Sequence, residues 1–371
     1  MVFRKIEHDT IVYLILTMKY LVAMSGGIDS SVAAVKLKKE GHEVVAVHLV
    51  LWAEDMETNK CCSTDDMCYA RQVAARFGIP FYNLDLSKQF KKDIVEKSFL
   101  DVYKKGMTPN PCVSCNREIR FGALIKMADD LGMDKVCTGH YSIVEEAGGT
   151  YKLKSGVDKS KDQSYFLHGL TQKQLARIYF PLGNMTKIEV IELAAKWDLI
   201  NTRRTRTESQ DLCFIPEKTP AAFLKRHLDK KYWDEGNIID RKKKKLGRHK
   251  GLPLYTIGQR KGIDIGGLEE ALYVIAKDEK NNTLVLGTNS EGLGDSLKIK
   301  NVNLITDFLD QSKSYSFKIR YGGSPYSGKI MLKKNNRAEI TLDKKVSGIT
   351  PGQFVAIYDG EYCLGGGEII R

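Results

Sequence analysis

The sequence contains no hydrophobic run long enough to cross a membrane. The longest apolar stretch near the N-terminus, from Ile11 to Met24, is interrupted by Lys19. It is shorter than the roughly 20 residues that a spanning helix needs. No small-residue cleavage site of a secretory signal peptide follows it. We therefore expect a cytoplasmic protein without a membrane partner, whose eight cysteines are reduced thiols rather than disulfide staples.

Low-complexity segments and internal repeats are also missing, which excludes fibrous and repeat architectures. Hydrophobic residues make up 42% of the chain and charged residues 28%, a balance typical of soluble globular proteins and not of disordered ones. At 371 residues the chain is too long for a small stapled scaffold. Two or three domains, each with its own core, are expected from this length.

Acidic residues are too few to balance the basic ones. The chain has 58 Lys and Arg against 46 Asp and Glu, a formal net charge of +12. Between Lys225 and Lys261 there are 13 basic and 4 acidic residues, so most of the excess lies in this one segment. Such a patch attracts polyanions, and nucleic acid is the first candidate. A solvated lysine-rich loop is the alternative.

Strands and helices alternate through the first part of the chain. Apolar strands are expected at 20–24, 43–52 and 81–84, and helices at 65–77, 90–105 and 118–131. The run from Glu43 to Trp52 is rich in β-branched residues, as in a strand that is buried on both faces. This order predicts a doubly wound α/β fold with a parallel sheet, whose ligand site lies outside the carboxyl ends of the strands.

The pattern changes after residue 142. A hairpin with Gly148 and Gly149 at its turn is followed by helices expected at 172–179 and 187–199, and then by a basic, weakly periodic segment. Short alternating runs such as 315–320, 338–342 and 354–358 predict an all-β barrel at the C-terminus.

A phosphate-binding loop follows the first strand. The segment Ser25-Gly-Gly-Ile-Asp-Ser-Ser31 joins a strand to a helix, so its backbone N–H groups, its hydroxyls and the helix N-terminus can face an anion. The loop lacks the Gly-Lys-Ser/Thr of a Walker P-loop. It resembles the pyrophosphate loop (PP-loop) of the ATP pyrophosphatases, which split ATP into pyrophosphate and an adenylyl group.

The spacing of the cysteines indicates which kinds of chemistry the chain can perform. Cys112 and Cys115 form a Cys-x-x-Cys pair ahead of the predicted helix at 118–131, where the helix dipole, Arg117 and Arg120 should lower a thiol pKa. Cys213 adds a third thiol in the string Ser-Gln-Asp-Leu-Cys-Phe-Ile. No second Cys-x-x-Cys exists, which argues against a four-cysteine zinc site.

Both cysteine segments resemble those of the bacterial-type tRNA-specific 2-thiouridylases, which sulfurate the wobble uridine of certain tRNAs. The strings Thr138-Gly-His-Tyr, Lys161-Asp-Gln-Ser-Tyr, Gly258-Gln-Arg-Lys-Gly and Cys363-Leu-Gly-Gly-Gly resemble family segments as well. The resemblance covers nearly all of the chain after Met18. It implies an ATP-pyrophosphatase catalytic domain at 18–215, a central basic tRNA-contacting domain at 216–288 and a C-terminal β-barrel domain at 289–371. Residues 1–17 form an N-terminal extension, either an added strand or sequence upstream of a true start at Met18, which is the reading that we favour.

The resemblance also implies the roles of individual residues. Cys213 would carry a persulfide, and Cys115 would attack it, releasing sulfide or forming a disulfide bond. The ATP-binding residues would be Ala23, Met24, Ser25, Gly26, Gly27, Ile28, Asp29, Ser30, Leu49 and Gly139. The tRNA-binding residues would be Asn110, Pro111, Cys112, His140, Lys161, Asp162, Gln163, Arg320, Tyr321 and Gln353.

Several points remain alternatives. Cys112, Cys115 and Cys213 could hold an iron-sulfur cluster with one open iron, or the reaction could run through the persulfide alone. ATP and Mg²⁺ are the expected cofactors, a persulfide carrier protein and tRNA the expected partners, and a monomer the expected state. A small-molecule ligase or amidotransferase of the ATP pyrophosphatases and a non-catalytic RNA-binding or iron-sulfur module are the alternative functions.

Overall fold

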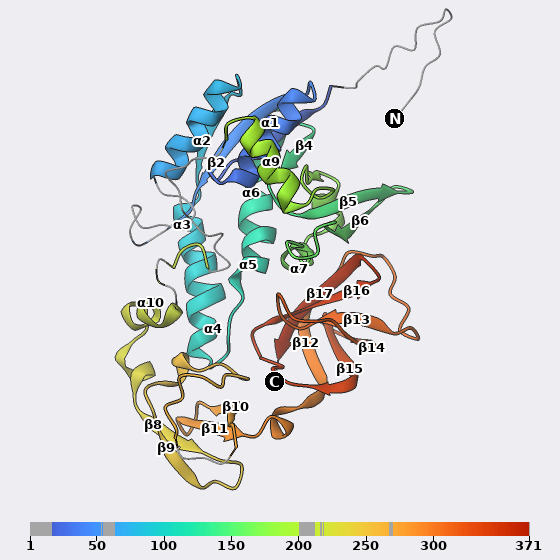
Figure 1. Cartoon of the computed structure of the whole chain (residues 1–371). Helices are drawn as coiled ribbons and strands as arrows, with labels where there is room; N and C mark the ends of the chain where they lie inside the picture. Colours follow the sequence, from blue (N-terminus) through green and yellow to red (C-terminus); the bar gives the residue numbers. More distant parts are fainter. Residues whose placement is uncertain are drawn as a thin grey trace, which may run out of the picture.

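The first part of the chain forms a five-stranded sheet (Figure 1). The computed structural model describes residues 17–52, 54, 64–199, 212–215, 217, 219–266 and 270–370. The strand order is β3-β2-β1-β4-β7, and every neighbouring pair is parallel. The strands are β1 (Lys19–Ala23), β2 (Glu43–Val50), β3 (Phe81–Asp85), β4 (Lys135–Cys137) and β7 (Ile178–Tyr179).

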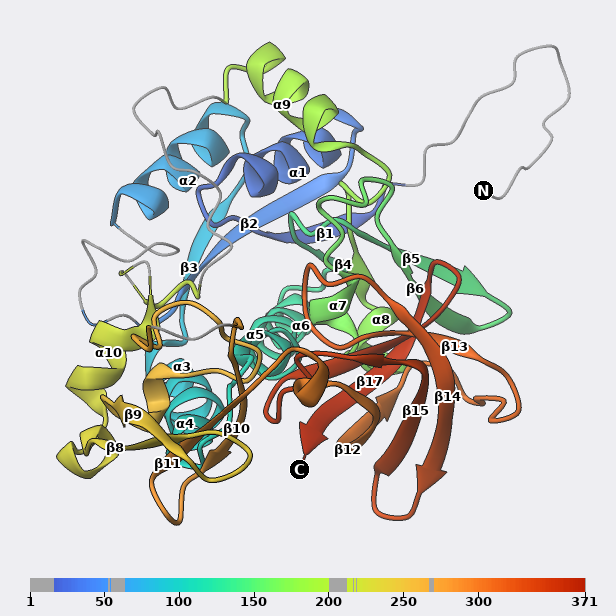
Figure 2. The ribbon, with the colours of Figure 1, turned by 60° about the horizontal axis from the view of Figure 1, so that its bottom comes forward.

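Helices cover both faces of this sheet, as Figures 1 and 2 show. One hydrophobic core contains Val44 and Ala46 of β2, and the other contains Val45 and Val47, so β2 is buried on both faces as predicted. The predicted doubly wound α/β fold is confirmed. Helices α1 (Ile28–Lys39), α2 (Thr64–Arg76) and α9 (Lys187–Lys196) cover one face. The other face is covered by α3 (Ser87–Phe90), η1 (Lys91–Leu100), α4 (Asp101–Lys104), α5 (Pro111–Ser114), η2 (Cys115–Arg120) and α6 (Phe121–Asp130).

The helix at the Cys-x-x-Cys motif begins earlier than predicted. The expected start was near Glu118, with both cysteines ahead of the helix, but helical turns run without a break from Pro111 through α6. Asn110 precedes the first turn, and Pro111 takes its first position, where the missing N–H of proline costs no hydrogen bond. Cys112 and Cys115 therefore lie inside the helix, in its first two turns.

The prediction of a helix at 172–179 is wrong for the second half of that range. Helix α8 (Gln172–Leu175) is short, and Ile178–Tyr179 form β7 at the edge of the parallel sheet. A two-residue strand has no periodicity that a sequence pattern can reveal, and its extended backbone comes from pairing with β4. Between the hairpin and α8 lies one further short helix, α7 (Ser164–Leu167).

The C-terminal part is a closed six-stranded barrel, as predicted. Antiparallel pairs connect β12, β15, β14, β13, β16 and β17 in that order, and a pairing of β12 with β17 closes the circle. The strands are β12 (Gly294–Leu304), β13 (Tyr315–Lys318), β14 (Tyr326–Lys333), β15 (Arg337–Val346), β16 (Phe354–Asp359) and β17 (Tyr362–Ile370).

A hairpin from the first half of the chain extends the sheet of the barrel. Strands β5 (Ser142–Ala147) and β6 (Thr150–Ser155) turn at Gly148 and Gly149, whose φ values of 60° and 79° suit glycine. Strand β6 then pairs with β17. The part of the chain that precedes the central domain and the C-terminal barrel therefore share one eight-stranded sheet, as Figure 2 shows.

A small central domain lies between these two parts in sequence, as predicted. Its four-stranded sheet has the order β10-β11-β8-β9 and its own hydrophobic core. In Figure 1 it lies at the opposite end of the molecule from α1. Among the helices that the structure describes, none has the length and apolar character that a bilayer crossing requires. The elements are α10 (Pro220–His227), η3 (Lys230–Trp233), β8 (Gly236–Ile239), β9 (Lys245–His249), η4 (Leu252–Leu254), β10 (Tyr273–Asp278), β11 (Thr283–Gly287) and η5 (Ser290–Gly292).

Candidate functional site

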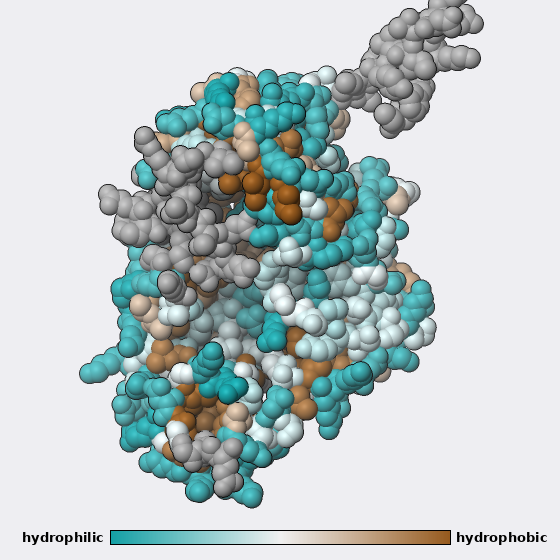
Figure 3. Space-filling view, viewed as in Figure 1, coloured by the Kyte–Doolittle hydropathy of each residue, from teal (hydrophilic) through white to brown (hydrophobic). Residues whose placement is uncertain are grey.

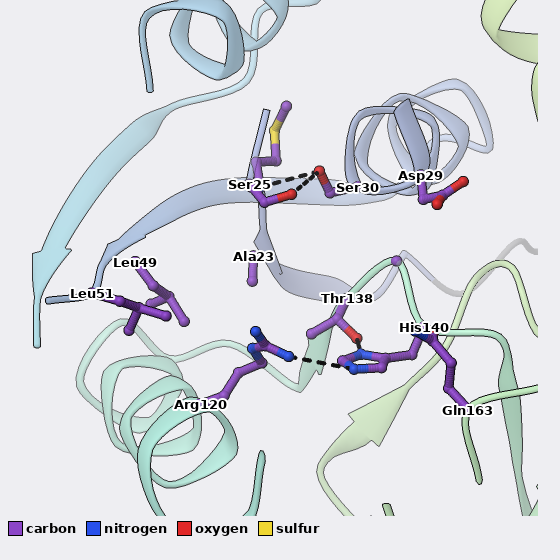
Figure 4. A pocket seen from close by; sticks show the side chains of 12 residues that line it. Ala23, Ser25, Asp29, Ser30, Leu49, Leu51, Arg120, Thr138, His140 and Gln163 are labelled. Carbon is purple, nitrogen blue, oxygen red and sulfur yellow. Dashed lines mark hydrogen bonds between the residues drawn. The ribbon is translucent and has the colours of Figure 1, made fainter. Parts of the chain in front are cut away.

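The loop between β1 and α1 is held in shape by its own polar groups (Figure 4). The N–H of Ser25 donates to Oγ of Ser30 over 3.1 Å, and this hydroxyl donates to the carbonyl of Gly27 over 3.0 Å. Gly26 has φ 80°, and a Cβ there would lie 2.3 Å from the carbonyl oxygen of Asp66. Only glycine fits this position. The loop leads into the N-terminus of α1, which is a favourable place for a phosphate group.

This loop forms one wall of a cavity of about 200 Å³. The segment after β4 comes so close to the loop that a Cβ on Gly139 would lie 2.9 Å from backbone atoms of Asp29 and Ser30. Seven of the predicted ATP-binding residues line the cavity, and Gly26, Gly27 and Ile28 belong to the loop beside it. The lining residues are Ala23, Met24, Ser25, Asp29, Ser30, Leu49, Leu51, Arg120, Thr138, Gly139, His140 and Gln163.

His140 and Arg120 both line this cavity, and their side chains point toward each other (Figure 4). The Nδ1 atom of His140 lies 2.6 Å from Oγ1 of Thr138, and Nε2 lies 3.4 Å from the guanidinium of Arg120. Desolvation of the ring and the positive charge of Arg120 lower the pKa of His140 to about 3. The ring is therefore neutral near pH 7. Nε2 then accepts from Arg120, and Nδ1 donates to Thr138.

Asp29 is held by two side chains from distant parts of the chain. Nζ of Lys187 lies 2.6 Å from Oδ1 of Asp29, and the hydroxyl of Tyr141 donates to the same oxygen over 2.8 Å. The Lys187 side chain is only 15% exposed. Sequence reasoning missed Lys187, which lies at the start of α9 and belongs to none of the motifs considered. The N-capping residue Thr186, paired with Glu189, was the one local signal that marked this helix start.

Cys115 and Cys213 contact the same hydrophobic core. Cys115 is buried in η2, and the half-buried Cys213 packs against the same cluster of side chains. The neighbouring Phe214 lies in this core as well, with its ring centroid 5.2 Å from that of Phe99. Residues 209–211 of the Cys213 string lie outside the described residues. The structure thus brings the two thiols to one side of the parallel sheet.

The three candidate iron-sulfur ligands do not form a metal site. Within the described part of the chain, which includes Cys112, Cys115 and Cys213, no three His, Cys, Asp or Glu side chains are grouped to hold a metal ion. These thiols therefore do not fit a cluster in this conformation. Asp29 also lines the cavity of about 200 Å³, and its carboxylate, which is bound by Lys187 and Tyr141, supplies oxygen atoms of the kind that Mg²⁺ prefers.

The other described cysteines are packing residues or surface residues. Burial raises the pKa of the Cys363 thiol to about 12 and that of Cys137 well above its usual value, so both remain protonated. Cys68 is exposed on α2. Cys61 and Cys62 lie outside the described residues.

The barrel holds the loop that precedes the Cys-x-x-Cys helix. Nε2 of Gln353 donates to the carbonyls of Thr108 and Pro109, both over 3.1 Å. A Cβ on Gly352 would lie 2.8 Å from the Thr108 carbonyl oxygen, so the two segments are in close contact. Gln353, a predicted tRNA contact, thus binds the loop that leads to Asn110.

The other predicted tRNA contacts differ in exposure. Arg320 is exposed, and the half-buried ring of Tyr321 lies 4.4 Å from that of Phe166. Asp162 is buried and accepts hydrogen bonds from Ser164 and Lys318, so it stabilises its own loop. Gln163 lines the cavity beside the 25–31 loop, and Lys161 is half-buried. Pro111 and Cys112 lie in α5. Asn110 lines a second cavity, of about 290 Å³, against the barrel.

Comparisons with known proteins agree with this architecture. Three family models match in succession: the tRNA methyl transferase HUP domain at 18–217, the tRNA methyl transferase PRC-barrel domain at 221–288 and the aminomethyltransferase beta-barrel domain at 294–369. Together they define a three-domain protein with a nucleotide-binding domain at its start.

The relatives identify the family. The tRNA-specific 2-thiouridylase MnmA of Geotalea uraniireducens is 43% identical over 359 residues, which cover 95% of this chain and 94% of the relative. The protein of the same name from Clostridioides difficile is 40% identical over 357 residues, or 95% of this chain and 98% of the relative. An NMN synthetase from Francisella tularensis is similar in structure over 52% of this chain and 67% of its own, at 21% identity and a TM-score of 0.34. The chain belongs to the tRNA-specific 2-thiouridylase family.

Proposed function

We propose that this chain is an ATP-dependent tRNA-uridine 2-sulfurtransferase, which replaces the C2 oxygen of the wobble uridine with sulfur. One observation carries the proposal: the helical run at 111–130 presents Cys115 to the core that Cys213 also contacts, and Arg120 to the nucleotide cavity. Cys115 and Arg120 lie at the two ends of the short segment η2, so a base beside Cys115 would lie close to a nucleotide in the cavity that Arg120 lines. The names of the relatives support the same reaction.

The first step activates the base. The uridine C2 oxygen attacks the α-phosphorus of ATP, pyrophosphate leaves, and the N3 proton is lost, which gives an O2-adenylated uridine. The loop at 25–31 would bind the phosphates with its backbone and with the N-terminus of α1. Asp29 would hold a magnesium ion, which supplies positive charge beside the phosphates. Arg120, which lines the same cavity, adds a fixed cation.

The second step transfers sulfur. A donor protein loads Cys213 with a persulfide, and the thiolate of Cys115 attacks the Cys213 sulfur. This forms a Cys115–Cys213 disulfide and expels the outer sulfur, which takes the place of the adenylate at C2, with AMP as the leaving group. A thiol reductant then reduces the disulfide. Contact of both cysteines with one core supports this pairing.

The persulfide route fits the described residues better than an iron-sulfur route, because the three thiols are not grouped as ligands. The base and its flanking nucleotides would contact Asn110, Pro111 and Cys112, with His140 and Lys161 to Gln163 nearby and Arg320, Tyr321 and Gln353 on the barrel. In this arrangement Cys112 borders the target base and is not a required sulfur carrier.

Sulfuration of tRNA by cysteine variants tests the proposal. With a persulfide donor, Cys115→Ser and Cys213→Ser should each lower sulfur incorporation by on the order of 100-fold or more. Both should still release pyrophosphate when unmodified tRNA is added, because adenylation does not use the thiols. Cys112→Ala should retain most of the activity, and Cys68→Ser is the matched control for loss of an exposed thiol.

The opposing results are equally clear. Wild-type protein that sulfurates no tRNA, and releases pyrophosphate only with a small metabolite, contradicts the assignment. Loss of iron and of all activity in the three variants Cys112→Ala, Cys115→Ser and Cys213→Ser, from an iron-containing wild type purified without oxygen, contradicts the persulfide route alone.

A further inference from the structure

The turn between β8 and β9 and the first residue of β9 carry five consecutive basic residues, Arg241 to Lys245, and all five side chains are exposed. We call residues 240–245 the basic turn. Its backbone is fixed, because the N–H of Asp240 donates to the carbonyl of Lys244 over 3.0 Å, and the N–H of Lys243 donates to the carbonyl of Asp240 over 3.0 Å. The Asp240 carboxylate accepts from the N–H of Lys244 over 2.8 Å. The charges are therefore displayed on an ordered hairpin.

None of these five cations forms an ion pair with any residue that the structure describes. Some other basic residues of the central domain are paired: Arg226 with Glu54 and Glu217, Arg248 with Glu235, and Lys250 with Asp264. Like charges on five consecutive residues repel one another, and a bound polyanion lowers this repulsion.

The basic turn lies far from the nucleotide cavity. In Figure 1 the strands β8 and β9 lie at the bottom of the molecule, and β2 and β4 of the parallel sheet lie near its top. Figure 3 shows hydrophilic residues along the lower rim, where Figure 1 places β8 and β9. A single ligand that occupies both places must be long and negatively charged along its length.

We propose that the basic turn binds the sugar-phosphate backbone of tRNA outside the anticodon stem-loop. The proposal rests on the proposed function, because it takes the RNA substrate to be held at the nucleotide cavity by its anticodon loop. Lysine ammonium groups bind phosphates as point charges without reading sequence. The turn has no apolar side chain, and lysine is depleted at protein-protein interfaces, so an acidic partner protein is the less suitable occupant.

A charge-neutralised variant tests the proposal. Lys242→Gln, Lys244→Gln and Lys245→Gln are combined, and Lys243 is kept because its φ of 65° is a strained position. The dissociation constants for an unmodified full-length tRNA and for its isolated anticodon stem-loop are measured across a salt series. Full-length tRNA should bind about 10-fold more weakly at 0.15 M salt, and its salt slope should fall by about 2 to 3. Binding and sulfuration of the isolated stem-loop should be unchanged.

The matched control removes the same charge elsewhere. Lys334, Lys344 and Lys345 are exposed lysines of the barrel, and their combined change to Gln should leave the full-length tRNA affinity within about twofold. Equal weakening by both triple variants, or equal affinity of the basic-turn variant and wild type, overturns the proposal. So does a variant that binds tRNA normally and loses sulfuration only with a protein donor, not with sodium sulfide, because the turn then docks the donor. A wild type that binds neither RNA contradicts the proposed function itself.

Discussion

At His140 the protein fixes a protonation state by desolvation and by a neighbouring cation. The pKa of His140 is lowered to about 3, whereas an unfolded histidine titrates near 6.5. Below pH 6.5 the unfolded chain therefore binds a proton at His140 that the folded protein does not bind. This difference lowers the free energy of unfolding as the pH falls from 6.5 towards 3. Each group of this kind lowers the free energy of unfolding by about 1.4 kcal/mol for every pH unit within this range.

A His140→Asn variant should show this dependence directly. Between pH 6.5 and 5, its free energy of unfolding should fall less steeply than that of the wild type, by up to about 1.4 kcal/mol per pH unit. Urea denaturation at closely spaced pH values measures the two slopes. The buried His168, whose pKa is lowered to about 4, remains in both proteins and contributes equally to them. Identical slopes would show that His140 is protonated in the folded state.

Site residues inside contiguous motifs could be predicted from the sequence, and those brought in by tertiary packing could not. Ser25, Asp29 and Gly139 line the cavity as expected, because the carboxyl ends of parallel strands meet at one edge of the sheet. Arg120 falls within the helix predicted at 118–131, but no local pattern shows that its side chain lines the cavity. Lys187 reaches Asp29 across 158 positions, and no local pattern encodes that contact.

At the scale of elements, the close approach of two loops makes the nucleotide cavity. A Cβ on Gly139 would lie 2.9 Å from the backbone at Asp29 and Ser30. Gly139→Ala should therefore separate the loops, destabilise the protein by about 1 to 3 kcal/mol, and lower tRNA-dependent pyrophosphate release at least tenfold.

Gly266→Ala provides the matched control for this substitution. A Cβ on Gly266 would meet no heavy atom within 4 Å, and its φ is not positive, so alanine there should change neither stability nor activity measurably. Thermal unfolding and a pyrophosphate assay on the two variants separate steric displacement from a general effect of losing glycine. Equal behaviour of the two variants would contradict the role assigned to Gly139.

The predicted element boundaries agree with the structure for long elements and disagree with it for very short ones. The eight residues of β2 carry a nearly continuous apolar pattern, and the strand predicted at 43–52 ends only two residues later than β2 does. The two residues of β7 carry none. The string Thr-Pro-Asn-Pro at 108–111 reads as a loop, although its second proline is the first residue of a helix.

At the scale of the whole molecule, the barrel and the nucleotide-binding domain are joined by half-buried polar contacts. Nδ2 of Asn303 donates to the carbonyls of His168 and Leu170, and Gln353 donates to the loop before α5. We expect the two parts to unfold in one calorimetric transition. The double variant Asn303→Ala, Gln353→Ala should lower the midpoint by several degrees or divide the transition, because removal of each donor costs about 1 to 3 kcal/mol.

The control for this change is Asn237→Ala, an exposed amide on β8 of the central sheet. Its calorimetric trace should match that of the wild type. Two separate transitions in the wild type itself would show that the shared contacts do not couple the two halves.

Strand β17 pairs with β12, β16 and β6, and it follows all three along the chain. During synthesis, β6 must therefore leave the ribosome with an open edge, and the barrel stays a curved sheet until β17 appears. A chain that stalls before residue 362 would expose unpaired strand edges in both halves at once, the condition that favours aggregation. Because β17 is synthesised last, its pairing both closes the barrel and covers the open edge of β6.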